Sequence, residues 1–273
     1  AYTVWRQDVD LNTDLSTVLG TRSAVLLWQD EPGLITDVSP LTMQNHGGVF
    51  TVTANTGGLS GNAVVAFKIG SEIYWTWHIW VVDGFNPDQN TGYHGSSGLT
   101  IMDRDLGAIN TIPGDIGSYG LYYQGGRKDP FPKASTTTNS GNLNHKTIYD
   151  IQNNVLPNNG TGINYTNVTA VVNLRNAVKN PMTYYFSVGY ESSDYNDATW
   201  YTTSTGTGHR NNLWRSWTPV IKTEFDPCPE GWKVPEANIF DMIPLPDTFI
   251  PATGFDLTDM YGNYVGFFPT NGV

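Results

Sequence analysis

The sequence predicts a mostly-β protein with a smaller α+β part. The first observation is composition: only 14% of the 273 residues are charged, against roughly 25% in an average soluble protein, while 13% are aromatic. The second is the presence of 29 Gly and 16 Pro, which interrupt helices and favour turns. The third is a series of short apolar runs between turn signals. Together these features are typical of secreted all-β modules.

Residues 1–83 predict a β-sandwich domain of the immunoglobulin-like kind. Strands are expected in four apolar runs bounded by turn residues, at 23–29, 48–54, 62–69 and 72–82. In the last run both alternating faces are largely apolar. We therefore expect this strand to be covered on both sides.

The polar, Gly-rich stretch at 84–98 predicts a linker loop, and residues 99–273 form a second predicted domain. Residues 133–164 show little apolar patterning and predict a long loop. The second domain is therefore expected to carry more irregular structure than the first.

One helix is expected in the second domain, at residues 167–179. Its apolar positions recur at i, i+3 and i+7 from Val171, and Pro181 ends it. A weaker helical signal follows Pro235. Short strands are expected at 183–188 and 249–253.

The formal net charge is −11, from 14 Lys and Arg against 25 Asp and Glu. This balance excludes nucleic acid as an expected partner, because phosphate binding needs a basic face. The longest apolar stretch, 73–82, is far shorter than the roughly 20 residues that cross a bilayer, so no transmembrane segment is expected. The chain begins at Ala1 without a leader segment, as if trimmed, either by a signal peptidase or by the choice of expressed segment.

Three stretches of the second domain resemble a known family. They read MDRDLGA at 102–108, GLYYQGGRKDPFP at 120–132 and KTEFDPCPEGWKVP at 222–235. Their words and order are similar to those of the Fibrobacter succinogenes major paralogous domain, a bacterial surface module. Two upstream stretches, at 24–35 and 61–82, resemble the segment that precedes this domain in surface and fimbrillin-like proteins of the Bacteroidetes group.

The resemblance implies a C-type-lectin-like fold for residues 99–273, a cell-surface or fimbrial location outside the cell, and no enzymatic activity that can be carried over. Gly125 departs from the family, which has Trp there. The chain also ends at Val273 without the last segment of the family pattern. A missing last strand would leave an open sheet edge, which predicts other surface or fibre subunits as partners.

Oxygen-bearing side chains gather at the domain boundary, where we name Asp83, Asn86, Asp88 and Asn90 as candidate calcium ligands. The spacing of an EF-hand is not met. Asn and Asp also form turns by bonding their own backbone, and we favour that interpretation. The polar loop at 192–197 offers the same two interpretations.

Aromatic residues are frequent between 184 and 217, among Ser, Thr, Asn and Asp. Exposed aromatic faces beside polar groups can stack on sugar rings, whereas buried ones only build a core, which we favour. Candidate glycan-binding residues are Tyr190, Tyr195, Trp200, Tyr201, Trp214 and Trp217.

Three other reactive residue types have structural interpretations that we favour. His78 lies in an apolar strand and is expected to be a hydrogen-bonded core imidazole. Cys228, the only cysteine, excludes an internal disulfide and a cysteine pair, and is expected to be buried. Arg127 is expected to fix a loop by pairing with Asp103 or Asp129, although it could bind an anion.

The leading hypothesis is a non-enzymatic extracellular surface protein, serving in adhesion or as a subunit or tip of a fibre or pilus. Its basis is the composition, the family resemblance and the lack of nucleophile or phosphate-binding motifs. One alternative is a carbohydrate-binding module, with calcium as its candidate cofactor. Another is an unrecognised secreted hydrolase, since paired carboxylates have no spacing signature.

Overall fold

The computed structural model describes most of the first half of the chain and separate parts of the second. Described residues are 17–44, 47–55, 57–86, 91–94, 100–135, 145–168, 172, 174–187, 214, 222–235, 255–258 and 264–268. The fold is 7% helical and 37% strand, so the predicted mostly-β class is confirmed.

Short strands dominate the described elements. The strands are β1 Arg22–Gln29, β2 Ile35–Val38, β3 Thr42–Gln44, β4 Gly47–Val49, β5 Val52–Ala54, β6 Gly61–Ile69, β7 Glu72–Val81, β8 Thr91–His94, β9 Thr100–Met102, β10 Tyr122–Tyr123, β11 Pro130–Phe131, β12 Asn164–Val168, β13 Thr183–Ser187, β14 Phe255–Thr258 and β15 Tyr264–Phe268. The helices are the 3-10 turn η2 Ile116–Ser118 and α1 Leu174–Lys179.

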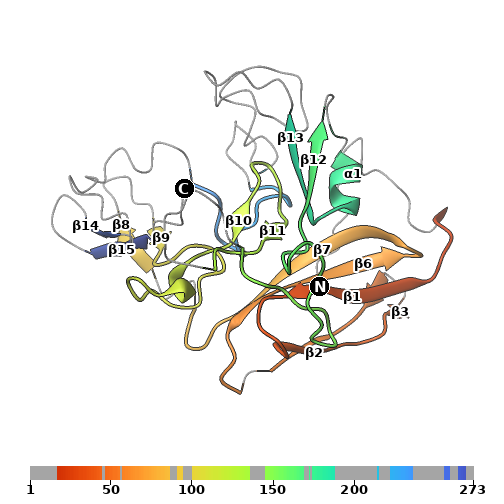
Figure 1. The fold of residues 1–273 in the computed structure, drawn as a ribbon, viewed down its shortest axis with the longest axis horizontal. Coiled ribbons are helices and arrows are strands. Elements are labelled where there is room, and N and C mark those ends of the chain that lie inside the picture. The colour runs from red at the N-terminus through yellow and green to blue at the C-terminus, as the bar shows by residue number, and fades with distance from the viewer. Residues whose placement is uncertain are drawn as a thin grey trace.

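The largest sheet has the strand order β1–β6–β7, and both pairings are antiparallel (Figure 1). Its strands confirm the predictions at 23–29, 62–69 and 72–82. β6 is central and buried along most of its length. Because its side chains alternate between the two faces of the sheet, each face is packed by a different part of the chain.

One face of β6 packs against the segment that follows β1. Ala63 of β6 forms a buried cluster with Leu34 and Ile35 at the start of β2. β2 pairs with β5, while β3 pairs with β4. The single strand predicted at 48–54 is therefore wrong: its two halves belong to different small sheets, and the chain leaves the strand conformation between them.

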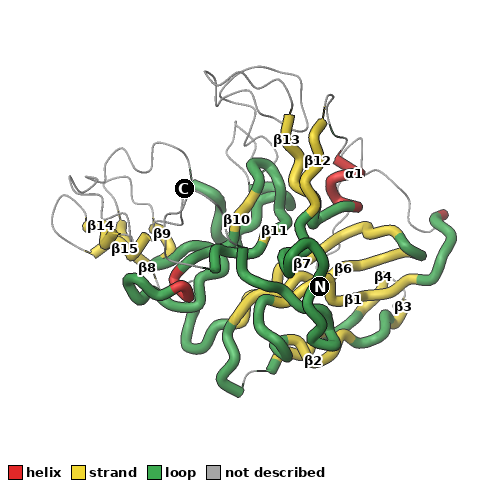
Figure 2. The backbone as a smooth tube through the Cα atoms, viewed as in Figure 1, coloured by secondary structure: helices red, strands yellow, loops and turns green. Residues whose placement is uncertain are grey.

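The other face of β6 packs against the second half of the chain. Val64 forms a buried cluster with Trp28 of β1, and with Leu121 and Ile148 from irregular segments. These segments consist mainly of loops and turns (Figure 2). The domain division at 84–98 stays a prediction, and side chains from both sides of it share this cluster.

β12 and β13 form a parallel pair that projects beyond β7 (Figure 1). The strand predicted at 183–188 is confirmed by β13. The helix predicted at 167–179 is only half right, because its first residues continue β12 and helical structure is described only for α1. Residues such as Tyr165 and Val168 favour a strand, and pairing with β13 outweighs the helical spacing.

α1 packs beside β7 and has six residues. Across the described segments, no helix has the length and apolar character needed to cross a membrane. The helical signal after Pro235 and the strand predicted at 249–253 lie outside the described residues.

Candidate functional site

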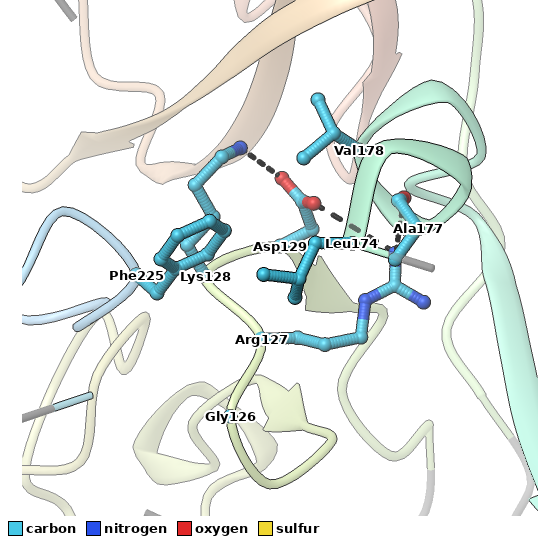
Figure 3. Close-up of a pocket in the computed structure, with 8 residues that line it drawn as sticks. All are labelled: Gly126, Arg127, Lys128, Asp129, Leu174, Ala177, Val178 and Phe225. Carbon is cyan, nitrogen blue, oxygen red and sulfur yellow. Dashed lines mark hydrogen bonds and ion pairs between the residues drawn. The ribbon is translucent and has the colours of Figure 1, made fainter. Parts of the chain in front are cut away.

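Among the described residues, the strongest concentration of buried charge is at 127–129, next to β7 and α1 (Figure 3). Arg127 is 2% exposed, and its guanidinium donates to four backbone carbonyls of the segment from α1 to β13. The Nη2 distances are 3.1 Å to Ala177 O, 3.1 Å to Asn180 O and 3.2 Å to Pro181 O. The fourth carbonyl is that of Thr183, bonded through Nη1. One guanidinium thus holds the whole turn between α1 and β13.

Arg127 also lies 3.7 Å from Asp129, measured from Nη2 to Oδ2. The predicted structural role of Arg127 is confirmed, with Asp129 as its carboxylate. Asp103, the other candidate, pairs instead with its neighbour Arg104, at 2.7 Å from Oδ1 to Nε.

Lys128 and Asp129 form a second, tighter pair at the edge of the main sheet. Lys128 Nζ lies 2.6 Å from Asp129 Oδ1 and donates to the backbone oxygen of Thr76 in β7 at 3.2 Å. The Thr76 hydroxyl is bonded to both charged groups. Lys128 Nζ also sits over the ring of Trp75, 4.4 Å from its centroid.

Burial and pairing shift the pKa values of this cluster. Burial lowers the pKa of Arg127 and of Lys128, because it disfavours their charged forms, although Asp129 partly offsets it. Burial alone would raise the pKa of Asp129. The neighbouring Lys128 and Arg127 outweigh burial and hold that pKa below its usual value. Asp129 therefore stays ionised between two cations.

The cavity at this cluster is small. It encloses about 10 Å³, which is space for a single water molecule. Leu174, Ala177, Val178 and Phe225 line it beside the charged residues, as Figure 3 shows. Each charged group here already has partners in the fold, so the cluster acts as an anchor that holds the loops on β7.

A second buried polar chain links the main sheet to the loops. Asp30 accepts hydrogen bonds from the backbone and side-chain nitrogens of Asn62, at 2.6 and 3.0 Å. Asn62 Oδ1 lies 3.0 Å from His78 Nε2, and His78 Nδ1 lies 3.5 Å from the hydroxyl of Tyr123. Burial lowers the pKa of His78 to about 4, against a smaller opposite effect of Asp30. The predicted hydrogen bonding of the imidazole is confirmed, and by side-chain exposure His78 is half-buried rather than fully buried.

Asn62 also donates to the carbonyl of Gly107, at 2.9 Å. Gly107 has φ +87, and a Cβ there would approach Leu121 Cγ to 2.5 Å. Only glycine suits both conditions. The Leu-Gly-Ala stretch at 106–108 is therefore explained by local packing.

Cys228 lies in a loop organised by Asp226. The Asp226 carboxylate accepts hydrogen bonds from Lys222 Nζ, from the backbone N–H of Cys228 and from that of Val234, each at 2.8 Å. Cys228 is half-buried, so it is more exposed than the buried position expected for it. Burial and, to a smaller extent, Asp226 raise the pKa of the Cys228 thiol, which keeps it protonated and unreactive at neutral pH.

Among the predicted glycan-binding residues, only Trp214 is described. It is half-buried, packs against Trp75, Val178 and Phe225, and donates from Nε1 to Arg127 O at 2.9 Å. This position gives Trp214 a core contact. The other predicted residues, Tyr190, Tyr195, Trp200, Tyr201 and Trp217, lie outside the described part of the chain, as does the loop at 192–197.

Two of the predicted calcium ligands are described. Asp83 and Asn86 are exposed and flank a turn in which Gly84 has φ +66. Asp88 and Asn90 lie outside the described residues. Where side chains are described, no three His, Cys, Asp or Glu residues are grouped to hold a metal ion.

Sequence reasoning missed a pair of exposed aromatic residues on β12 and β13. Tyr165 is 60% exposed and Tyr184 37% exposed, and the parallel register places them directly opposite each other. Their ring centroids are 6.1 Å apart. Tyr165 lies in no predicted strand. The residues Tyr, Thr and Val within 165–168 favour a strand and could have predicted one there.

Comparisons of the chain with protein-family models, with curated proteins and with solved structures find no match in any of the three. The family resemblance therefore rests on the sequence stretches quoted above.

Proposed function

We propose that this chain is a non-enzymatic extracellular surface protein that serves in adhesion or as a subunit or tip of a fibre or pilus. The observation that carries the proposal is that the buried charged side chains hold loops in place. Arg127 holds four carbonyls of the segment from α1 to β13, and Lys128 and Asp129 fasten the same region to β7. These groups make a rigid support for surface loops, which is what a binding or assembly module needs.

The finer architecture belongs to the same proposal. We assign residues 1–83 to an immunoglobulin-like β-sandwich and residues 99–273 to a C-type-lectin-like domain that lacks its last segment. The packing of β2 and β5 on one face of the main sheet supports the first assignment. Small sheets joined by long irregular segments support the second. An open sheet edge would then pair with a strand from another subunit.

Localisation and turnover test the leading function together. Cells that produce the chain are labelled with a specific antibody and immunogold, before and after surface proteolysis. We expect gold on the cell exterior or along fibres, and its loss after proteolysis. Gold confined to the cell interior, or steady turnover of glycan, ester or peptide substrates by the purified chain, would contradict the proposal.

Carbohydrate binding is a second candidate function, favoured by the exposure of Tyr165 and Tyr184. A glycan array run with and without EGTA tests it. Binding that disappears with EGTA would support the calcium-assisted form and the loop at 83–90. Absence of binding in both conditions would dismiss this function and leave the leading proposal standing.

A further inference from the structure

The exposed tyrosine pair is the feature of the described surface whose chemistry points to a ligand. In the parallel register, Tyr165 of β12 is opposite Tyr184 of β13, so both side chains leave the same face of the ribbon. Their rings are tilted by 50° to each other. Asn167, two residues along β12, leaves that same face and is exposed. We call Tyr165, Tyr184, Asn167 and the neighbouring His145 the tyrosine platform.

The platform is held from below by the buried network. Arg127 bonds the carbonyl of Thr183, the residue before Tyr184. Gln124 bonds the residue after it, donating from Nε2 to Tyr185 O at 2.5 Å. The Tyr184 ring also meets the buried ring of Phe131, at 5.7 Å between centroids. The backbone that carries Tyr184 is thus fixed before any ligand arrives, which lowers the entropy cost of binding.

His145 gives the platform a defined hydrogen-bonding pattern. Its Nδ1 lies 2.6 Å from the carbonyl of Pro132, so Nδ1 carries the proton and donates to that oxygen. Nε2 is then an acceptor for the hydroxyl of Tyr165, 3.5 Å away. That bond is at the long limit of hydrogen bonding. An incoming hydroxyl could therefore share the Nε2 lone pair or bond the Tyr165 oxygen.

Sugars match this combination of groups. A pyranose ring offers an apolar C–H face that stacks on an aromatic ring, and hydroxyls that bond phenol, amide and imidazole groups. The platform carries no carboxylate or ammonium, and the chain has a net charge of −11. Both facts disfavour anionic sugars. A proline-rich peptide could also stack on tyrosine, but it would leave most of these donors and acceptors unused.

We propose that the tyrosine platform binds a neutral hexopyranose residue of a glycan. The inference deepens the carbohydrate-binding candidate and rests on it, but it does not depend on the surface role. If the chain binds no sugar, the proposed surface location still stands. If the chain is found inside the cell, the proposed sugar site still stands.

The test uses the full chain on an array of neutral oligosaccharides, sialylated or sulfated oligosaccharides and oligoproline peptides, followed by calorimetry with the best neutral glycan. We expect Tyr165→Ala to weaken binding about tenfold or more, because it removes a stacking face. Tyr165→Phe keeps that face and should weaken binding less. Val155→Ala serves as the matched control, since Val155 is 59% exposed elsewhere on the chain.

Tyr165 carries the test because its ring is the more exposed of the two, so its removal should leave the melting temperature unchanged. Tyr184→Ala is a second variant that removes the other ring, with folding checked by circular dichroism. The proposal is overturned by binding of only anionic glycans or oligoproline, by no binding at all, or by neutral-glycan binding that Tyr165→Ala leaves unchanged.

Discussion

The main sheet and the irregular segment between β9 and β13 are held together by different forces. In the sheet, long antiparallel strands bury alternating apolar side chains, as in the cluster of Leu34, Ile35 and Ala63. In the irregular segment, buried polar side chains bond the backbone carbonyls of turns, and Arg127 is the main example. The difference shows that a few buried polar side chains can hold a long loop region in one conformation.

That comparison has an energetic consequence. Losing one apolar side chain from the sheet costs its burial energy and a cavity. Losing one buried donor from the loops removes several hydrogen bonds to interior backbone acceptors at once and weakens a buried ion pair. The loop region should therefore depend more sharply on single residues than the sheet does.

The largest effect is expected for Arg127→Met. It removes the donor to four carbonyls and leaves Asp129 with one cation, so the free energy of unfolding should fall by roughly 3–5 kcal/mol. Urea unfolding measures this, and hydrogen exchange should rise at 174–187. Arg175→Met is the control: Arg175 is only half-buried, over the ring of Tyr74, and should lose less than about 1 kcal/mol. Equal losses would refute the distinction.

Ile148→Ala tests whether the two regions unfold together. Ile148 is fully buried against Trp28 and Val64 of the sheet and Leu121 of the loops, so truncation should cost roughly 2–5 kcal/mol. A single shifted unfolding transition, seen by both tryptophan fluorescence and circular dichroism, is expected. Two separate transitions, of which only one moves, would show that the loops and the sheet are independent.

We expect the stability of the fold to depend on pH through His78, which lies where the main sheet meets the loops. Its pKa is lowered to about 4 when folded and is about 6.5 when unfolded, so the unfolded chain binds the proton first. Stability should therefore fall as the pH drops from about 6.5 to about 4, by up to roughly 3 kcal/mol. In His78→Gln this part of the dependence should disappear. Identical profiles for both proteins would contradict it.

Asp226→Asn should weaken the loop that holds Cys228. The variant loses the charge that Lys222 and two backbone N–H groups bond, at a cost of roughly 1–3 kcal/mol. It also removes one cause of the raised pKa of Cys228. Cys228 should then react faster with a thiol reagent at pH 8. An unchanged rate would show that Asp226 does not organise this loop.

The smallest expected change in stability comes from substitutions at two neighbouring glycines of the loop region, Gly125 and Gly126. Gly126 has φ +83, so Gly126→Ala should cost roughly 1–2 kcal/mol. At Gly125 a Cβ would meet no atom within 4 Å, so Gly125→Trp should change stability by no more than about 0.5 kcal/mol. Thermal unfolding of both variants measures the contrast, and a destabilised Gly125→Trp would show that the space is occupied.

The same contrast explains what could be predicted from the sequence. The strands at 23–29, 62–69 and 72–82 are apolar runs bounded by turn residues, which is a local signal, and the structure confirms them. The structural role of Arg127 was also predictable, because a buried arginine needs a carboxylate and Asp129 is close in sequence.

What could not be predicted depends on contacts between distant segments. The carbonyls that Arg127 binds lie 50 or more residues away, and carbonyls carry no sequence signal. The start of the helix expected at 167–179 pairs as a strand with β13, which its own spacing does not reveal. For the same reason, the neighbours Tyr165 and Tyr184 were not expected to form one surface.

The contact of Lys128 with Thr76 bears on how copies of this chain could associate. Since an ammonium occupies the oxygen of Thr76, a strand that paired with β7 at this residue would have to displace a buried cation first. At Thr76 the edge of the sheet is therefore protected against pairing with a strand from another copy.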